Sequence, residues 1–579
     1  MYLQALKPHA RTYFLRLTRE SKLSITSQPP GEITAPLAQR IGWAVLILIT
    51  LYVCYFSHLG VIGFVGPDEP RYAWIARDMA ETGDWITPRL YGKPWFEKPP
   101  LFYWGAALSF KLFGVSEAAA RLPSGISALL ATLALAWLVW RTYGEECARW
   151  LLLLLPTSVG MIGFSHAAAT DMPFAGMLTV AMVCAAVLLG LTQSENTPIL
   201  PRTPWLALLL FGFFLGLAVL AKGPAAIILS GGAVFFWAVF TKRWRDAFRL
   251  LHPAVLASFS ITALPWYILC ARRNPDFFRI FIIEHNFKRY LTPEFQHIQP
   301  FWFYLPILLI ALFPWALSAL VVARNILGDK SNPVARSQGI LTLCWFLWPL
   351  LFFSLSQSKL PGYILPAIPP GILLSVQALF CRRHRSATYF RTFAITAGAT
   401  LVAAAVAFWS FEKRIASGQD IIPAPWHESI WVPLLLGGII SILIVWKKGA
   451  DAALVCCTAT LLLALAGLYG GLHWLDRLYS ARQSAHDASV LYPVFDSSYA
   501  AVYQVPRGIQ FGLNYYLRRE TWDWSPGDAT AKWVFTPYRG TALVERQGFR
   551  CPHYIVFPAA FPCENVKLLG RLGGGREPK

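Results

Sequence analysis

Long runs of apolar residues dominate this sequence and constrain its fold more than any other feature. The runs are about 17 to 25 residues long, which is the length that an α-helix needs to cross roughly 30 Å of hydrocarbon. The chain is also 56% hydrophobic and only 14% charged, whereas soluble globular proteins contain roughly 25% charged residues. We therefore predict an all-α polytopic membrane protein with about thirteen transmembrane helices.

Basic residues predict the orientation of these helices. Residues 1–40 are basic and polar, so we expect this N-terminal segment to be cytoplasmic. No small-residue cleavage pattern follows the first apolar run, which we interpret as a retained signal anchor. Alternating crossings then make every cytoplasmic loop basic, in agreement with the positive-inside rule. The predicted helices lie at about 42–63, 121–140, 148–166, 173–192, 205–221, 223–240, 254–271, 301–323, 338–356, 362–380, 392–410, 429–446 and 452–471.

The net charge of +20 does not indicate a nucleic-acid partner. It arises from 51 Lys and Arg against 31 Asp and Glu. In a membrane protein, loop charge and anionic lipid account for such an excess. The ten Cys show no spacing typical of a metal site.

The last hundred residues differ from the rest of the chain and, after an odd number of crossings, lie outside the cytoplasm. The strand-like runs AAVYQV, AKWVF and HYIVF, with the helix-like stretch GIQFGLNYYLRR between them, predict a small α/β domain. Cys551 and Cys563 could form a disulfide there. No cluster in this part looks catalytic, so a lid, a scaffold and a partner surface stay open as its role. The predicted domains are 1–40, the transmembrane domain 41–475 with outer loops 64–120 and 272–301, and 476–579.

The most polar outer stretch, from Gly66 to Trp104, follows the first apolar run. Within it, Pro70 suits the first turn of a short amphipathic helix and Gly83 suits its end. The residues expected on the buried face of this helix are Tyr72, Ile75, Ala76 and Met79. Asp68 could cap the helix or take part in chemistry, and its position favours neither role.

A turn and a second acid add to these candidates. Glu97 and Lys98 precede a double proline, which forces Lys98 into an extended conformation. This turn suits a cation for a phosphate with a carboxylate for a metal or a sugar hydroxyl, or simply an interfacial turn with a snorkelling lysine. Asp171 in TDMP could likewise be a functional acid or the cap of a helix that begins at Met172.

The remaining outer loops also carry ionisable residues close to helix ends, where such residues tend to face a polar cavity. Arg272 and Arg273 could contribute to that cavity or form only a charged rim. The other candidates of this kind are Lys222 in AKGP, His285 in EHNFKRY and Lys359 in QSKLPGY.

These motifs together resemble a known superfamily. The stretch PDEPRYAWIARDMAETGDWITPRLYGKPWFEKPP is similar to the first periplasmic loop of the bacterial lipid A aminoarabinose transferases and of protein O-mannosyltransferase-like enzymes, within the GT-C glycosyltransferases. The resemblance continues in order through TDMPF, AKGPAA, LPWY, ARRNPDFF, EHNFKRY, HIQPFWFYLP and LSQSKLPGYILP. It covers about 40–375 and is weaker beyond about 380.

The resemblance implies a GT-C membrane fold and specific residue roles. Asp68 and Asp171 match catalytic acids, and Lys98, Arg273 and Tyr363 match residues that hold the lipid phosphate. Glu97 matches a residue associated with a divalent metal ion in some members. Further candidates, without a defined role, are Glu69, Arg71, Tyr72, Lys222, Arg272, His285 and Lys359.

The implied activity is inverting transfer of a sugar from a polyprenyl (undecaprenyl) phosphate donor, without a nucleotide cofactor. The acceptor stays open between lipid A, another lipid or glycan, and protein as in the O-mannosyltransferases. The implied location is the bacterial inner membrane, with the active site on the periplasmic side. A polyprenyl-lipid transporter or flippase is the alternative, but it predicts ionisable residues along a path through the membrane, whereas here they gather at one surface. A membrane scaffold would need no paired acids in separate loops.

Overall fold

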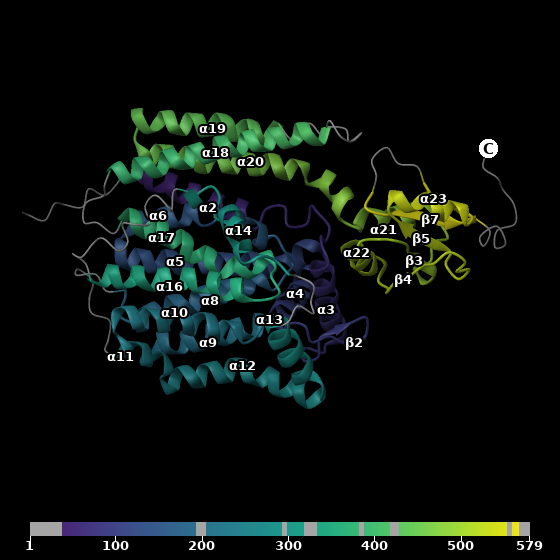
Figure 1. Ribbon diagram of the computed structural model, residues 1–579, viewed down its shortest axis with the longest axis horizontal. Coiled ribbons are helices and arrows are strands. Elements are labelled where there is room, and N and C mark those ends of the chain that lie inside the picture. The colour runs from purple at the N-terminus through teal and green to yellow at the C-terminus, as the bar shows by residue number, and fades with distance from the viewer. Residues whose placement is uncertain are drawn as a thin grey trace, which may run out of the picture. The chain divides into compact units, whose positions relative to one another are not determined.

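The computed structural model describes residues 37–192, 204–291, 298–317, 333–380, 387–416, 428–552 and 558–566. It separates into two compact units, Met1–Leu48 and Ile49–Lys579. The described chain is mostly helical, with a small sheet near the C-terminus (Figure 1). The predicted fold class, a polytopic all-α membrane protein with a C-terminal α/β part, is therefore confirmed.

Helices occupy the positions of the predicted apolar runs. Among the described residues, ten helices are long and apolar enough to cross a membrane, and the pair α6 and α7, bent by 63°, would make an eleventh. The predicted number of about thirteen is higher because the runs at 223–240 and 301–323 correspond to shorter helices here, and 318–323 lies outside the described residues. The helices are α2 Leu37–Tyr55, α5 Glu117–Tyr143, α6 Glu145–Leu154, α7 Val159–Ser165, α8 Asp171–Leu188, α9 Trp205–Lys222, α10 Ala225–Thr241, α12 Pro253–Arg273, α14 Tyr304–Ala311, α16 Pro333–Leu355, α17 Ile368–Phe380, α18 Ala387–Ala416, α19 Glu428–Lys447 and α20 Ala450–Tyr479.

Helix α8 packs closely against both α5 and α9. Gly176 of α8 makes the first contact possible, because a Cβ at this position would lie 2.6 Å from the Ser127 carbonyl oxygen of α5. On the other side of α9 lies α12, while α18, α19 and α20 form a separate group side by side (Figure 1). Short helical segments connect the long helices: α11 Trp244–Ala247, η1 Phe248–Leu251, η2 Arg279–Lys288, α13 Arg289–Leu291, η4 Phe301–Phe303 and η5 Pro361–Ala367.

The polar stretch after α2 folds into α3 Asp68–Thr82, a two-stranded hairpin of β1 Arg89–Leu90 and β2 Lys93–Pro94, and α4 Leu101–Phe113. The predicted helix and its end are confirmed, because α3 is capped by Gly83 in the left-handed conformation with a φ of 77°. The four residues predicted on its inner face are all buried, in a core shared with α4: Tyr72, Ile75, Ala76 and Met79.

The C-terminal part contains a five-stranded sheet in the order β4-β3-β5-β7-β6. β3 runs parallel to β4 and β5, and α22 makes the first crossover that such parallel pairing requires. The predicted disulfide between Cys551 and Cys563 is confirmed, whereas the predicted strand HYIVF lies outside the described residues. The elements are α21 Arg482–Leu491, η7 Ser497–Tyr499, β3 Ala500–Val502, α22 Arg507–Leu517, β4 Trp522–Asp523, β5 Trp533–Thr536, α23 Tyr538–Arg546, β6 Phe549–Arg550 and β7 Phe561–Asn565.

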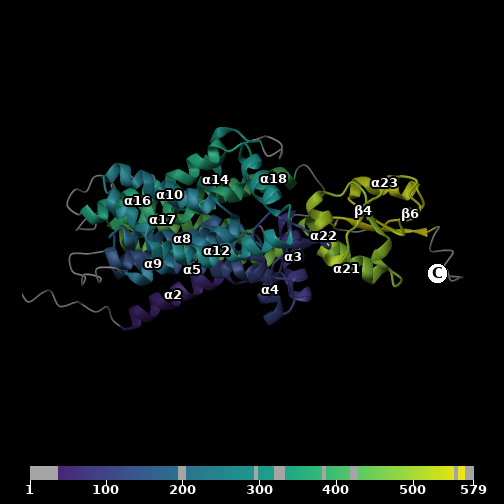
Figure 2. The same cartoon turned by 90° about the horizontal axis from the view of Figure 1, so that it is seen from below.

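Helix α22 joins this C-terminal part to the end of the membrane-spanning part that carries α3. It contacts α3 and lies beside it in both views (Figures 1 and 2). The Tyr516 hydroxyl accepts a hydrogen bond from the Phe64 amide and donates one to Glu117, at 2.9 and 2.8 Å. Asn514 donates to the Tyr91 hydroxyl at 2.9 Å. The C-terminal domain is therefore attached close to the start of α3.

Candidate functional site

The start of α3 and the turn before α4 bring two acids and two cations together. The Arg71 guanidinium binds the Asp68 carboxylate one turn earlier and donates to Glu97 at 3.1 Å. Lys98 lies on the other side of Glu97, with its Nζ 3.6 Å from a carboxylate oxygen. Asp68, Glu97 and Lys98, which the sequence indicated separately, thus form one cluster around Arg71.

Arg71 is held by rings as well as by charges. Its guanidinium carbon lies 5.6 Å from the Trp95 ring and 5.2 Å from the Phe511 ring of α22. Burial alone would lower the pKa of Arg71, but the Glu97 and Asp68 carboxylates outweigh it and raise the pKa. The side chain therefore stays charged at any physiological pH and fixes the two carboxylates relative to each other.

Asp171 heads a second cluster. Its carboxylate binds the ammonium of Lys222, at the end of α9, and this ammonium also lies 4.7 Å from the centre of the Tyr363 ring. Gly362 lies against the same carboxylate, since a Cβ there would be only 2.6 Å from its Oδ1. Three predicted candidates, Asp171, Lys222 and Tyr363, thus come together from three separate helical segments.

The capping alternatives for both acids are wrong. α3 begins at Asp68 itself and α8 begins at Asp171 itself, so each acid is the first helical residue. The residues before them, Pro67 and Thr170, occupy the cap positions, and neither helix has a hydrogen bond from a capping side chain. Each carboxylate is turned toward a cation instead.

Glu69, another candidate, is bound on both oxygens inside the protein. Arg121 of α5 donates to it at 2.8 and 2.9 Å, and the amides of Val65 and Ala168 donate at 2.8 and 2.7 Å. Ala168 precedes Asp171 by three residues, and Asp68 is the neighbour of Glu69 in the chain. The bond between Glu69 and Ala168 therefore brings the two acidic clusters into the same region.

Arg273 lies at the end of α12 and is more than half exposed. Its guanidinium donates to Asp84 at 3.1 Å, in the loop that follows α3. Phe277, one turn further on, packs against Phe96, the neighbour of Glu97, with ring centres 5.3 Å apart. The Arg273 segment is thus attached to the Glu97 turn, whereas Arg272 is simply exposed.

Three further candidates lie apart from these contacts or deeper in the core. Lys359 is buried in the turn before η5 and donates to the carbonyls of Ser356 and Gln299 at 2.6 and 3.1 Å. His285 is half-buried on η2. Tyr72 is fully buried, and its ring packs against Tyr103 behind the Asp68 cluster. Among the described residues, no hydrogen bond or ion pair joins Lys359 to Asp68 or Asp171.

Among the described residues, no preformed divalent metal site surrounds Glu97. A metal needs several oxygen or nitrogen ligands around one point, and the described residues contain no group of three or more His, Cys, Asp or Glu that could supply them. The two carboxylates that do converge, Asp68 and Glu97, face the Arg71 guanidinium.

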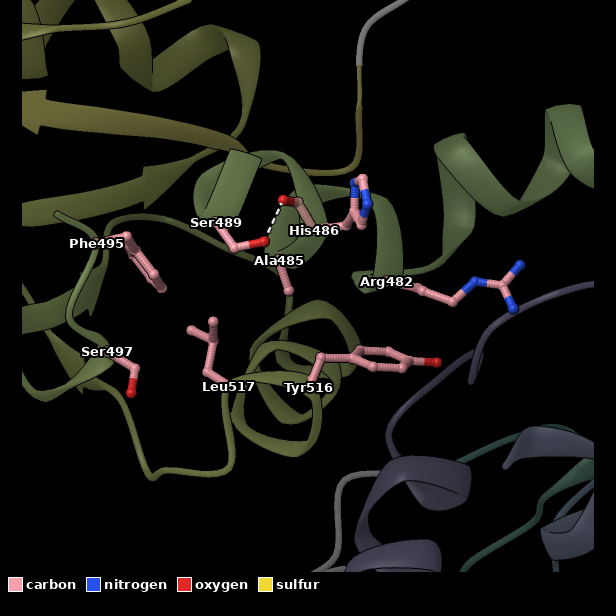
Figure 3. Close-up of a pocket in the computed structure, with 8 residues that line it drawn as sticks. All are labelled: Arg482, Ala485, His486, Ser489, Phe495, Ser497, Tyr516 and Leu517. Carbon is pink, nitrogen blue, oxygen red and sulfur yellow. Dashed lines mark hydrogen bonds between the residues drawn. The ribbon is translucent and has the colours of Figure 1, made fainter. Parts of the chain in front are cut away.

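A separate cavity of about 380 Å³ lies in the C-terminal domain. Figure 3 shows Phe495 and Leu517 turned toward each other at one end of it, and Arg482 and Tyr516 extending to the other side. Arg482 is paired with Asp476 at 2.6 Å and lies 3.4 Å from Glu117. None of the predicted site residues lines this cavity.

The chain is similar to known proteins in sequence and in fold. Residues 42–281 match the family model described as dolichyl-phosphate-mannose-protein mannosyltransferase. In solved structures, the chain is similar to ArnT from Cupriavidus metallidurans bound to undecaprenyl phosphate, with a TM-score of 0.73, 22% identity, and coverage of 92% of this chain and 99% of that one. The chain therefore has the fold of that structure. Both similarities agree with the resemblance seen in the sequence motifs.

Curated relatives carry a common name. An undecaprenyl phosphate-alpha-4-amino-4-deoxy-L-arabinose arabinosyl transferase of Serratia proteamaculans is 32% identical over 366 residues, which are 62% of this chain and 63% of the relative. A transferase of the same name from Pseudomonas aeruginosa is 32% identical over 347 residues, 60% of this chain and 61% of the relative. The match thus spans about three fifths of the curated relatives.

Several residues that shape this site could not be recognised from the sequence. Arg121 sits in the apolar run of α5, and only its charge within that run could have marked it. Trp95 and Phe511 contact Arg71 through their rings, and aromatic residues are too common in this chain to stand out. Phe511 in particular is more than four hundred positions from Arg71 in sequence.

Proposed function

We propose that this protein is an inverting glycosyltransferase that moves a sugar from a polyprenyl phosphate to an acceptor outside the cytoplasm. The observation that carries the proposal is the pair of acid-and-cation clusters, Asp68 with Arg71, Glu97 and Lys98, and Asp171 with Lys222 and Tyr363. The names of the curated relatives support an undecaprenyl-linked aminoarabinose as the donor sugar. Lipid A is the acceptor that we favour, and protein is the alternative suggested by the mannosyltransferase model.

Transfer of the sugar requires both an acidic group and cationic groups at the site. The acceptor oxygen forms a bond to the anomeric carbon while the bond from that carbon to the phosphate oxygen breaks on the opposite face. The electron pair stays with the departing polyprenyl phosphate, which cations stabilise. A hydroxyl acceptor gives its proton to a base. We assign this role to Asp68, whose side chain is 45% exposed. A phosphate acceptor is already anionic and loses no proton, so Asp68 then orients the reactants.

Lys98, Arg273 and Tyr363 are the residues that we assign to the donor phosphate. Lys98 lies beside Glu97, with its Nζ 3.6 Å from a carboxylate oxygen, and its ammonium offers a point charge for a phosphate. Arg273 is exposed at a helix end and offers a planar fork suited to phosphate oxygens. A lipid donor also explains a site at the ends of membrane-spanning helices, because the polyprenyl tail stays in hydrocarbon while its head group reacts.

We also propose that the protein lies in a bacterial inner membrane with this site on the periplasmic side. The basic cytoplasmic loops expected from the sequence support the orientation. The disulfide between Cys551 and Cys563 supports an oxidising compartment for the C-terminal domain. Labelling of introduced single cysteines in the outer loops with a membrane-impermeant reagent in intact spheroplasts tests the orientation, and labelling only after lysis would reverse it.

The decisive experiment is sugar transfer by purified protein in lipid. Wild type and Asp68→Asn are each given radiolabelled undecaprenyl-phosphate aminoarabinose or other polyprenyl-phosphate sugars, with lipid A or peptides as acceptors. We expect label on lipid A with wild type and none with the variant. Glu81→Gln is the matched control, because Glu81 pairs with Arg77 at the other end of α3 and should leave transfer unchanged.

Each outcome of this assay separates the candidate functions. Label on peptides would favour the mannosyltransferase-like activity. Movement of the donor across the bilayer without transfer would favour a flippase. EDTA in the same assay tests whether transfer requires a divalent metal. We expect EDTA to leave transfer unchanged because Glu97 binds Arg71. Loss of transfer that Mg²⁺ or Mn²⁺ restores would instead assign a metal to Glu97.

A further inference from the structure

The C-terminal domain reaches the Asp68 cluster through the first turns of α22. Gly508 packs on the backbone just before Asp68, where a Cβ would lie 3.0 and 3.1 Å from the carbonyl carbon and Cα of Gly66. Gly66 itself has a φ of 69°, which favours glycine. The two backbones therefore approach each other closely, and this approach brings the side chains on either side of Gly508 near the Asp68 cluster.

Those side chains are Arg507 and Phe511. The Phe511 ring lies 5.2 Å from the guanidinium carbon of Arg71 and, equally, 5.2 Å from that of Arg507. One ring of the C-terminal domain thus contacts a cation of the catalytic cluster and a second cation from its own helix. This contact also holds Arg507, which otherwise would sample many rotamers, near the cluster.

The charges of the two arginines are compensated differently. Arg71 lies between the Asp68 and Glu97 carboxylates, and Lys98 adds a second cation beside Glu97. The charges of these two acids and two cations cancel one another. Arg507 is exposed, and no ion pair joins it to a carboxylate in the described part of the chain. Arg507 therefore adds to the rim of the site a positive charge that no carboxylate pairs in the described part of the chain.

We infer that Arg507, held by Phe511, is an acceptor-binding residue that binds a phosphate group of the phosphorylated lipid acceptor. The inference rests on the proposed glycosyltransferase activity and adds to it a residue that recognises the acceptor. Arginine suits this role because its planar fork binds two phosphate oxygens at once. Phe511 is a positioning residue that acts through Arg507 and Arg71.

The test compares acceptor kinetics at saturating donor. The acceptors are bisphosphorylated lipid A and the same lipid after enzymatic dephosphorylation of one position, each in mixed micelles. We expect Arg507→Gln to raise the KM for the bisphosphorylated acceptor by at least about tenfold, since hydrogen bonds to charged groups contribute about 1.5–3 kcal/mol. The kcat and the donor KM should stay close to wild type, and Arg507→Lys should recover part of the loss.

Three further variants make the result specific. Phe511→Ala should raise the acceptor KM and also lower kcat, because Arg71 loses a ring contact, whereas Phe511→Tyr should restore both. Arg539→Gln, which removes an exposed arginine of α23 in the same domain, should behave like wild type. A change common to Arg507→Gln and Arg539→Gln would mean a general effect of surface charge and would overturn the inference.

The remaining outcomes separate this inference from the proposed function. Transfer by wild type with an unchanged acceptor KM in Arg507→Gln would overturn the inference and leave the activity standing. A raised donor KM instead would assign Arg507 to the donor phosphate and overturn it as well. Absence of transfer by wild type with every donor would remove the proposed function, and the inference with it.

Discussion

Asp68 and Glu69 are neighbours in sequence, and loss of their charges should have opposite consequences. The Glu69 carboxylate is almost buried and accepts four hydrogen bonds, two of them from Arg121. Removal of one partner from a buried ion pair costs about 3–5 kcal/mol, because the other charge stays buried without compensation. Glu69→Gln should therefore lower the free energy of unfolding by that amount.

Asp68 should contribute far less to stability. Its carboxylate is nearly half exposed and is paired with Arg71 one turn along the same helix. Water screens such a pair, so it contributes about 0–1 kcal/mol. We expect Asp68→Asn to unfold like wild type and to lose sugar transfer, whereas Glu69→Gln should unfold more easily while the folded fraction still transfers sugar.

The two effects can be measured in the same preparation. Unfolding is followed by Trp fluorescence in mixed micelles with increasing SDS, and transfer is expressed per folded protein. Arg121→Met should be as destabilising as Glu69→Gln, and the double variant should lose less than the sum of the two by about 0.5–3 kcal/mol, because neither charge is then left alone. Wild-type stability in Glu69→Gln together with abolished transfer would refute the structural role of Glu69.

Three further outcomes follow from named contacts. Gly362→Ala should reduce transfer because its Cβ would lie 2.6 Å from Asp171 Oδ1. The control Gly163→Ala should leave transfer unchanged because that position has open space around it. Equal activity of the two variants would contradict the assigned packing. Replacing both Cys551 and Cys563 by Ser should destabilise the C-terminal domain by about 3 kcal/mol, because the unfolded chain gains the conformational entropy of the loop that the disulfide closes. The loss is measured as faster proteolysis of that domain, and unchanged proteolysis would argue against this contribution. Lys98→Ala and Arg273→Ala should weaken binding of undecaprenyl phosphate more than they disturb folding, and unchanged binding in a well-folded variant would remove the assignment to the donor phosphate.

The fold and the positions of the site could be predicted largely from local signals. Apolar runs of membrane-spanning length marked the helices, and the spacing of Tyr72, Ile75, Ala76 and Met79 marked the inner face of α3. Asp68, Lys98 and Asp171 could be recognised as candidates because charged residues are rare in this chain and these three lie outside the apolar runs. These signals depend on residues within one or two turns of each other.

The partners of those residues could not be predicted, because they come from distant segments. Arg121 and Glu69 are 52 positions apart, and no spacing in the sequence relates them. Capping was an open alternative for Asp68 and Asp171 because the sequence does not show that Arg71 and Lys222 lie within reach. The contact of Phe511 with Arg71 depends on how the C-terminal domain docks on α3, which involves Gly508 and Gly66 at positions without any local periodic pattern.

Exposure, more than residue type, separates function from structure at this site. Each acid near the start of α3 has a cation as partner, so pairing alone does not distinguish a catalytic carboxylate from a structural one. The Glu69 side chain is 10% exposed with all its hydrogen bonds inside the protein, and a substrate could reach it only by breaking them. The Asp68 side chain is 45% exposed while Arg71 binds one of its oxygens, so it stays accessible from solvent. We therefore propose that the second of the two acids at the start of this helix holds α5 and that the first contacts the acceptor.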